Sequence, residues 1–131
     1  MKKSNTVITI AAAALFAASP IIAHEGHEHQ GKEAVGENKQ EVTVKGEVNE
    51  RTGFVVDLKQ LKEILESEVV SAMDHRHLNK EVHEFATAVP TVENLAVVIW
   101  KRLAPKLKTA KLHRVRVYES DDLFADFLGE D

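Results

Sequence analysis

The sequence contains no cysteine, and this absence excludes several kinds of chemistry at once. Without cysteine the chain has no disulfide bond, no thiolate nucleophile and no zinc site of the Cys type. Aromatic residues are also few, with five Phe, one Trp and one Tyr, and the net charge is −4 without any basic run. This composition argues against nucleic acid as a main partner.

No hydrophobic run is long enough to form a stable membrane span. The apolar stretch TVITIAAAALFAAS, at residues 6–19, follows the basic start MKKSN and precedes PIIA. This pattern predicts a secretory signal peptide over residues 1–23, although Ile21 is large for its position near the cleavage site. The alternative is a β-strand, because TVITI is rich in β-branched residues.

Residues 24–40, HEGHEHQGKEAVGENKQ, hold almost no large apolar side chains, and we interpret them as a His-rich linker. His24, His27 and His29 lie within six positions of one another in this stretch. Such tracts bind zinc, copper or nickel loosely. The stretch is therefore either a solvated spacer or part of a metal site that does chemistry.

Residues 41–131 carry the patterns of one folded domain. EVTVKGEV, at 41–48, alternates as a half-buried antiparallel strand does, with Val42, Val44 and Val48 on one face. Apolar residues then recur at helical spacing from the N-cap Asp57 to Met73, and again over residues 91–103. LHRVRVYE and LFADFL follow as strands. This order predicts an α+β fold, an antiparallel sheet with helices on one face.

Three groups of residues in this domain are candidates for function. Asp74 directly precedes His75, and a carboxylate can orient an imidazole and stabilise its charged form for acid–base work; the alternative is a polar helix-to-loop junction. Glu119 follows two valines on one strand face, so partial burial and a ligand with paired N–H donors are expected, unless the strand end is solvated. Thr91 is explained first as a helix N-cap.

Taken together, these segments resemble the 6-pyruvoyl-tetrahydropterin synthase / 6-carboxytetrahydropterin synthase family. The stretches that carry the resemblance are EVTVKGEVNERTGFVVDLKQLK, MDHRHLN, PTVENLAVVIWKRL and HRVRVYESDD, which together span about residues 41–127. The resemblance implies a tunnelling fold, in which two helices cover one face of a four-stranded antiparallel sheet. It also implies a homo-oligomer, a trimer or hexamer, in which the sheets of several subunits join into a barrel.

The resemblance also implies an activity and a set of site residues. Family members act on 7,8-dihydroneopterin triphosphate with a three-histidine zinc site, and their products enter queuosine or tetrahydrobiopterin synthesis. The family's Asp–His relay falls on Asp74 and His75, its pterin-anchoring glutamate on Glu119, and its threonine near the pterin on Thr91.

The N-terminal third departs from the family pattern. LFAAS places Ser19 where the family has a zinc-binding histidine, no cysteine is available as general base, and AVGENKQ at 34–40 stands where the family has H-G-H. Either the first segment, with its first strand, is missing or replaced, or residues 34–40 are an insertion and His27, His29 and His24 supply the zinc ligands. In a strand, His27 and His29 would face the same way and could share one metal ion.

Three functions are consistent with these residues. The first is a 6-carboxytetrahydropterin synthase-like lyase, impaired if the zinc site is incomplete. The second is a non-catalytic pterin-binding protein, and the third is an exported metal-binding protein with the same fold. The signal pattern places the protein in the periplasm or outside the cell, whereas the family chemistry places it in the cytoplasm.

Overall fold

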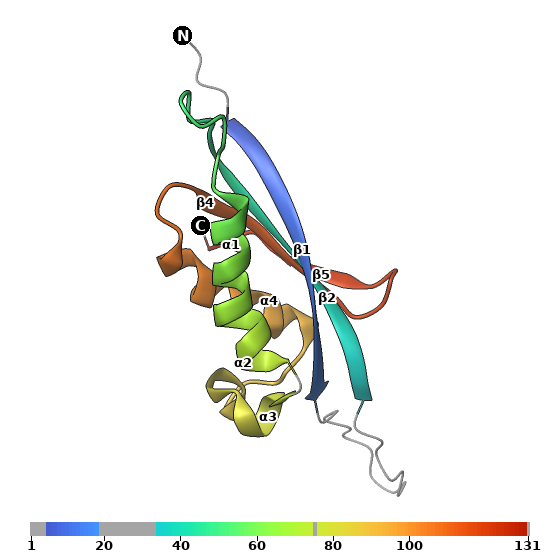
Figure 1. Cartoon of the computed structure of the whole chain (residues 1–131). Helices are drawn as coiled ribbons and strands as arrows, with labels where there is room; N and C mark the ends of the chain where they lie inside the picture. Colours follow the sequence, from blue (N-terminus) through green and yellow to red (C-terminus); the bar gives the residue numbers. More distant parts are fainter. Residues whose placement is uncertain (1–4, 19–33, 75, 131) are drawn as a thin grey trace, which may run out of the picture.

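The computed structural model describes residues 5–18, 34–74 and 76–130, and its centre is a single sheet (Figure 1). The strands lie in the order β3-β1-β2-β4-β5. Their bounds are β1 Asn5–Ala18, β2 Ala34–Glu47, β3 Arg76–His77, β4 Lys111–Tyr118 and β5 Phe124–Phe127. β1, β2, β4 and β5 pair antiparallel, and the two-residue β3 adds to β1 in parallel. The predicted four-stranded antiparallel sheet is confirmed.

Two long helical segments cover one face of this sheet (Figure 1). The first runs as α1 Leu58–Leu65, the π-helix η1 Glu66–Val70 and α2 Ser71–Met73. The second is α4 Val92–Leu103, followed by the short η3 Ala104–Lys106. Between them lie α3 Leu78–Glu81 and η2 His83–Ala86, in a stretch that was predicted as a loop. No helix in the described part of the chain has the length and apolar character needed to span a membrane.

The first strand of the fold is present, which corrects the expectation that it is missing or replaced. β1 pairs with β2 without interruption, from Asn5 opposite Glu47 to Ala18 opposite Ala34. Residues 34–40, predicted as linker, therefore form the first half of β2. For residues 5–18 the structure has the β-strand that was the alternative to a signal peptide, and the export signal itself stays a prediction.

The core lies between the sheet and the two helical segments. Val42 and Val44 of β2 and Val115 and Val117 of β4 are fully buried on this face, as their alternation predicts. Val48, expected on the same face, is 44 % exposed because β2 ends at Glu47. The helices contribute Leu61, Leu65, Val69, Met73, Leu95, Ile99 and Leu103. Each fully buried side chain of this size contributes about 1.5–3 kcal/mol to folding.

Candidate functional site

Glu119 lies at the point where β4 ends and the chain turns back into β5. Its backbone N–H donates to the Leu123 carbonyl oxygen at 2.7 Å, and the Ser120 N–H donates to the same oxygen at 3.2 Å. The Ser120 hydroxyl in turn accepts from the Leu123 N–H at 3.2 Å. These bonds hold the turn in one conformation, so the backbone that carries the Glu119 side chain has a defined place at the end of the sheet.

A pocket of about 230 Å³ opens beside this carboxylate. It is lined by Lys39, Tyr118, Glu119, Ser120 and Asp121. The Glu119 side chain is exposed in the single chain, so of the two alternatives for this residue the solvated strand end is confirmed and partial burial is not found. The strand alternation that predicted burial ends at Tyr118, one residue too early to carry Glu119 into the core.

Tyr118 connects this pocket to a polar network on the sheet face that the helices leave open. Its hydroxyl donates to Glu41 Oε1 at 3.2 Å, and the Glu41 carboxylate also pairs with Lys39 Nζ at 3.4 Å and Arg114 Nη2 at 3.5 Å. Lys39 and Tyr118 were not among the residues predicted for the site. The strand alternation places Tyr118 on the open face, but only the pairing of β2 with β4 brings Lys39 beside it.

Arg116 of β4 stabilises the same turn through its contacts with β5. Its guanidinium donates two hydrogen bonds to Asp126 on β5, at 2.7 and 2.9 Å, and lies 3.8 Å from the centre of the Phe124 ring. The hydrogen bonds from Arg116 lower the pKa of the Asp126 carboxyl. Because both partners flank the Glu119 turn, this pair fixes the hairpin that presents Glu119.

The second predicted site, Asp74 with His75, lies next to the opposite edge of the sheet. Asp74 is partly buried just after α2, and its N–H donates to the Val70 carbonyl at 2.7 Å. His75 lies outside the described residues. The next two residues form β3, which pairs with β1 at Phe16 and Ala17. The segment is therefore anchored beside the far end of β1.

Thr91 has the structural role that was the first explanation for it. Its side-chain oxygen accepts from the Asn94 N–H at 3.2 Å, which caps the start of α4. The residue is exposed. The capping role is confirmed, and the contact of Thr91 with a pterin stays a prediction.

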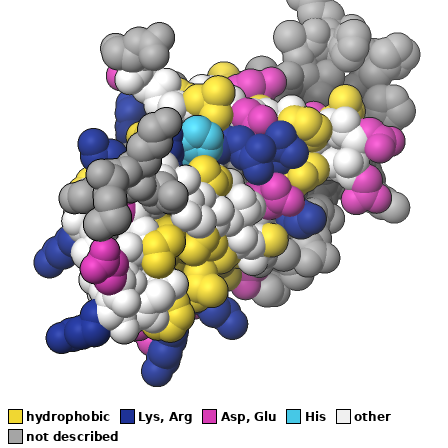
Figure 2. All heavy atoms as spheres, turned by 90° about the horizontal axis from the view of Figure 1, so that it is seen from above, with side chains coloured by type: hydrophobic (Ala, Val, Ile, Leu, Met, Phe, Trp, Pro, Cys, Tyr) yellow, Lys and Arg dark blue, Asp and Glu magenta, His cyan; other side chains and the backbone are white. Residues whose placement is uncertain are grey.

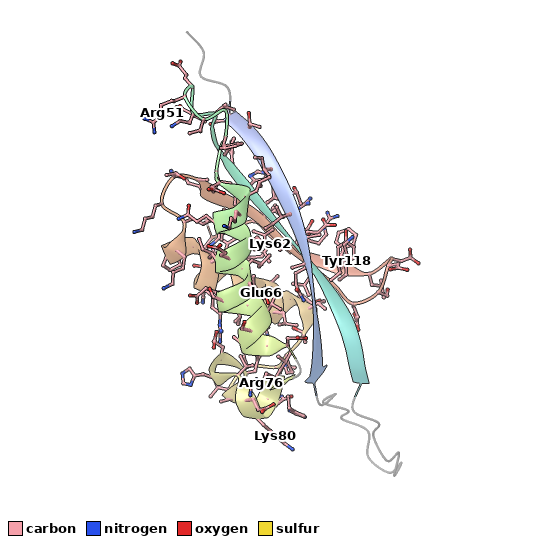
Figure 3. The ribbon with its side chains drawn as sticks, in the orientation of Figure 1. Arg51, Lys62, Glu66, Arg76, Lys80 and Tyr118 are labelled. Carbon is pink, nitrogen blue, oxygen red and sulfur yellow. The ribbon has the colours of Figure 1, made fainter. Side chains whose placement is uncertain are left out.

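The single chain does not bring these residues together into one site. β1 and β2 lie between β3 and β4, so three interstrand steps, roughly 14 Å, separate the Arg76 strand from the Glu119 strand. Figure 3 shows Arg76 near α3 and Tyr118 on the side of the sheet away from α1. The two halves of the predicted site are thus separate within one subunit.

The comparisons with known proteins decide the family. The family model for 6-pyruvoyl tetrahydropterin synthase matches residues 16–130. The 6-pyruvoyl tetrahydrobiopterin synthase of Homo sapiens is 38 % identical over 105 residues, which cover 80 % of this chain and 68 % of the human protein. The chain belongs to the 6-pyruvoyl tetrahydropterin synthase family. The match begins well before Glu41, the start that the sequence predicted for the family domain.

Further relatives agree with this assignment. The 6-pyruvoyl tetrahydrobiopterin synthase of Poecilia reticulata is 39 % identical over 92 residues, covering 70 % of this chain and 63 % of that protein. The chain thus spans about two-thirds of the length of these curated relatives. The solved structure of the Caenorhabditis elegans 6-pyruvoyl tetrahydropterin synthase has the same fold, with a TM-score of 0.84 over 99 % of this chain and 100 % of that one at 24 % identity.

Zinc is the cofactor that membership of the 6-pyruvoyl tetrahydropterin synthase family implies, but the described residues do not fit a three-histidine site. No group of three His, Cys, Asp or Glu side chains within residues 5–18, 34–74 and 76–130 is placed to hold a metal ion. His24, His27 and His29 lie outside the described residues. Residues 34–40, where the family has H-G-H, continue β2 in register with β1, which favours replacement of the histidines over insertion of a loop.

Proposed function

We propose that this protein binds a pterin through Glu119 and acts as a lyase on 7,8-dihydroneopterin triphosphate. The observation that carries the proposal is the pocket at the end of β4, where a firmly held turn presents the Glu119 carboxylate beside Tyr118 and Lys39. A carboxylate accepts two parallel N–H bonds from a planar heterocycle, and the aminopyrimidine ring of a pterin offers such a pair. Glu119 thus binds and orients the ring.

Asp74, His75 and Thr91 complete the proposed site. A carboxylate beside an imidazole raises the imidazole pKa and holds the ring for proton transfer, which suits Asp74 and His75 as an acid–base pair acting on the substrate side chain. Thr91 supplies a hydroxyl at the start of α4 for contact with the pterin. No step is assigned to zinc, because the described residues do not supply its ligands.

The separation of Glu119 from Asp74 supports an assembly in which neighbouring subunits complete the site. β1 is paired on its outer edge only at Phe16 and Ala17 among the described residues, and β5 forms the other edge of the sheet. An open edge at each end of the sheet allows β5 of one copy to pair with β1 of the next. We therefore expect a trimer or hexamer by native mass spectrometry, and a monomer at micromolar concentration would contradict this.

A non-catalytic pterin-binding protein is the second candidate function. Two observations favour it: the chain has no cysteine to act as general base, and residues 34–40, which begin β2 where the resemblance places H-G-H, contain no histidine. In this case the Glu119 pocket keeps its affinity for a pterin while turnover is lost.

The test separates binding from turnover. Neopterin fluorescence reports affinity in the wild type, in Glu119→Gln and in Asp121→Asn, which removes one carboxylate from the same pocket as a matched control. Loss of a charge-assisted pair predicts a dissociation constant about 10- to 100-fold higher for Glu119→Gln alone. Equal affinities in all three proteins would contradict a pterin site at Glu119.

Turnover is measured on 7,8-dihydroneopterin triphosphate with added zinc, by chromatography of the products. A 6-pyruvoyl product assigns the activity that the names of the relatives carry, and a 6-carboxy product assigns the branch that leads to queuosine. Binding without either product identifies the non-catalytic protein. Absence of both binding and product, in protein that melts cooperatively, would refute the proposal.

A further inference from the structure

Two lysines stand directly opposite each other on neighbouring strands at the end of the sheet near the N-terminus. Lys45 of β2 and Lys111 of β4 are register partners, in the stretch that follows the register shift between Thr43 and Val44. Directly opposed like charges destabilise a sheet, and both side chains are exposed. Neither forms an ion pair within the described residues. An opposed, unneutralised pair of this kind is costly to the sheet unless an anion lies between the two charges.

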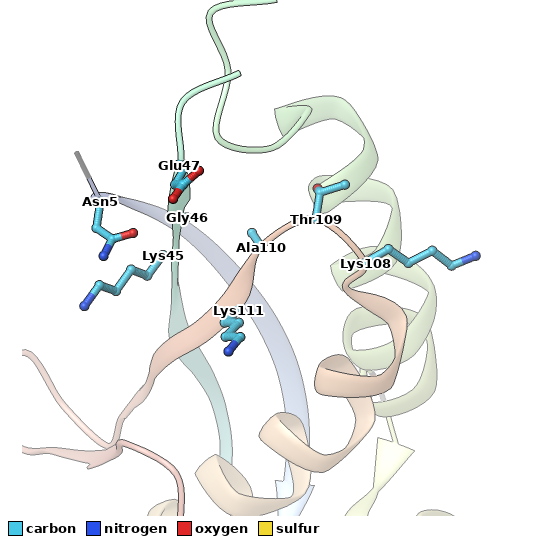
Figure 4. Close-up of a pocket in the computed structure, with 8 residues that line it drawn as sticks. All are labelled: Asn5, Lys45, Gly46, Glu47, Lys108, Thr109, Ala110 and Lys111. Carbon is cyan, nitrogen blue, oxygen red and sulfur yellow. The ribbon is translucent and has the colours of Figure 1, made fainter. Parts of the chain in front are cut away.

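A pocket of about 410 Å³ lies at these two lysines (Figure 4). It is lined by Asn5, Lys45, Gly46, Glu47, Lys108, Thr109, Ala110 and Lys111. Its size is in the range of small-molecule sites. Figure 4 shows Lys108 extending away from Lys45 and Lys111, so the donors on the side of the lysine pair are the two ammonium groups and the Asn5 amide. In the view from above, Lys and Arg side chains project along one part of the outline of the molecule (Figure 2).

This pocket is separate from the Glu119 site. Lys111 begins β4 and Tyr118 ends it, so the length of the strand, roughly 24 Å, lies between the two pockets. None of the residues that line one pocket lines the other. The lysine pair and the Glu119 carboxylate thus belong to separate pockets of the single chain.

We propose that this pocket binds an oligophosphate group, with Lys45 and Lys111 holding one phosphate between them. The ammonium group of lysine is a compact point charge with three donors, which suits the oxygens of a phosphate. One multiply charged phosphate neutralises both lysines and removes their repulsion, whereas a single carboxylate leaves one positive charge. Glu47 also lines the pocket, so the ligand must carry enough charge to bind beside one carboxylate.

Inorganic triphosphate is the probe for the first test, and the melting midpoint of the full chain is the readout. All samples contain EDTA, so that chelation of metal by triphosphate has no effect, and sodium chloride keeps the ionic strength constant. A ligand that binds only the folded state raises the midpoint. We expect triphosphate to raise the midpoint of the wild type and of Lys62→Gln equally. For Lys45→Gln and Lys111→Gln we expect a smaller rise of the midpoint, because the dissociation constant of triphosphate increases by about 10-fold or more.

The Lys62→Gln variant is the matched control, because it removes one exposed lysine from α1 and changes the net charge by the same amount (Figure 3). Equal losses of response in Lys62→Gln and Lys45→Gln would show that triphosphate acts only through net charge, which overturns the proposal. A second arm uses GTP. Equal responses to GTP and triphosphate assign the site to the free oligophosphate, and a stronger response to GTP assigns it to a nucleotide.

Lys45→Glu gives a second, opposite signature. It converts the repulsive pair into an attractive cross-strand pair with Lys111, so without ligand the midpoint rises by roughly 1–4 °C, while the response to triphosphate disappears. A variant that is more stable than the wild type has lost binding for a reason other than misfolding. Retention of the triphosphate response in Lys45→Glu would overturn the proposal.

Discussion

Among single residues, Glu84 is one whose charge is tied directly to the packing of the helices. Its carboxylate accepts two hydrogen bonds from Arg102 of α4, at 2.5 and 2.7 Å, and Arg102 also donates to the Glu68 carbonyl in the π-helix at 3.0 Å. The side chains of Glu84 and Arg102 are only 31 % and 23 % exposed. The hydrogen bond from Arg102 lowers the pKa of Glu84. One arginine thus joins three helical elements.

We predict that Glu84→Gln lowers the free energy of unfolding by about 1 kcal/mol at neutral pH, because it breaks a bidentate pair that is largely shielded from solvent. Since the folded pKa of Glu84 lies below the unfolded value of about 4.3, the ionised carboxylate stabilises the protein above that pH. This contribution is lost as the pH falls through the folded pKa. Urea unfolding of the wild type and Glu84→Gln at pH 7 and at successively lower pH measures it.

The exposed Glu63→Gln on α1 is the control for the loss of one negative charge. The difference between the wild type and Glu84→Gln should shrink below about pH 4, whereas the small effect of Glu63→Gln should stay small throughout. A difference for Glu84→Gln that is the same at pH 7 and at the lowest pH of a folded sample would show that its charge is not responsible.

Thr91 has one demonstrated role and one proposed role, and two substitutions separate them. Thr91→Ala removes the N-cap of α4 and should cost about 1 kcal/mol of stability, whereas Thr91→Asn keeps a capping oxygen. If Thr91 also contacts the pterin, Thr91→Asn binds neopterin more weakly at nearly unchanged stability. Melting curves and neopterin titrations of both variants give the answer. Unchanged neopterin affinity in Thr91→Asn would leave capping as its whole role.

At the scale of the element, the β4–β5 hairpin determines where Glu119 lies. Arg116 and Asp126 join the two strands on the open face, and the Tyr118 hydroxyl, which accepts from Arg116 at 3.4 Å, links them to β2 through Glu41. Of these residues Tyr118 lines the pocket, whereas Arg116 and Asp126 hold the hairpin without lining it. We classify Arg116 and Asp126 as positioning residues for Glu119.

We predict that Asp126→Asn weakens neopterin binding severalfold although Glu119 is intact, because one amide cannot accept both guanidinium hydrogen bonds. Asp122→Asn, an exposed substitution in the same turn, is the control. Fluorescence titration gives the affinities, and the melting midpoint shows whether the fold is kept. If Asp126→Asn and Asp122→Asn bind neopterin equally well, the hairpin does not need the Arg116 pair to place Glu119.

The elements also show which parts of the fold the sequence could predict. The half of β2 from Glu41, the two long helical segments, β4 and β5 have apolar residues at regular spacing, and they lie close to the predicted positions. The Ala-rich second half of β1 and the polar first half of β2 are different, because the residues there carry no alternation, whereas TVITI at the start of β1 is rich in β-branched residues. They are strands because they pair with each other across residues 19–33. A long-range pairing of this kind leaves no local signal in the sequence.

Of the candidate site, the sequence could predict the residues that lie in motifs but not those that strand pairing brings beside them. Glu119, Thr91 and Asp74 were identified because they lie in motifs, and motifs are local in the sequence. Lys39 and Tyr118 join Glu119 only through the register of β2 against β4. The pair of Lys45 and Lys111 depends on the register shift at Thr43, which no pattern in the sequence indicates.

At the scale of the whole molecule, β1 lies within residues 1–23, which the sequence predicts as a signal peptide. A test of export is therefore also a test of whether the fold needs β1. Cleavage after Ala23 would remove all of β1, including Ile8, Ile10 and Ala12, which pack against the core, and Thr9, whose hydroxyl lies 2.7 Å from that of Thr43. The whole of β2 would then lose its partner on one side. The buried valines of β2 would be exposed at a new sheet edge, which favours aggregation.

We predict that a chain lacking residues 1–23 fails to melt cooperatively and forms aggregates, whereas a chain lacking only residues 1–4, which precede β1, melts within a few degrees of the full protein. Calorimetry and size-exclusion chromatography of the two truncated proteins measure this.

Mass spectrometry of the N-terminus of the protein isolated from cells completes the test. If the mature protein begins at residue 24 and melts cooperatively, β1 is dispensable and its place at the edge of β2 is taken by another strand. If the intact N-terminus is retained, residues 5–18 serve the fold, and the charged and apolar pattern that predicts a signal peptide reflects a strand preceded by lysines.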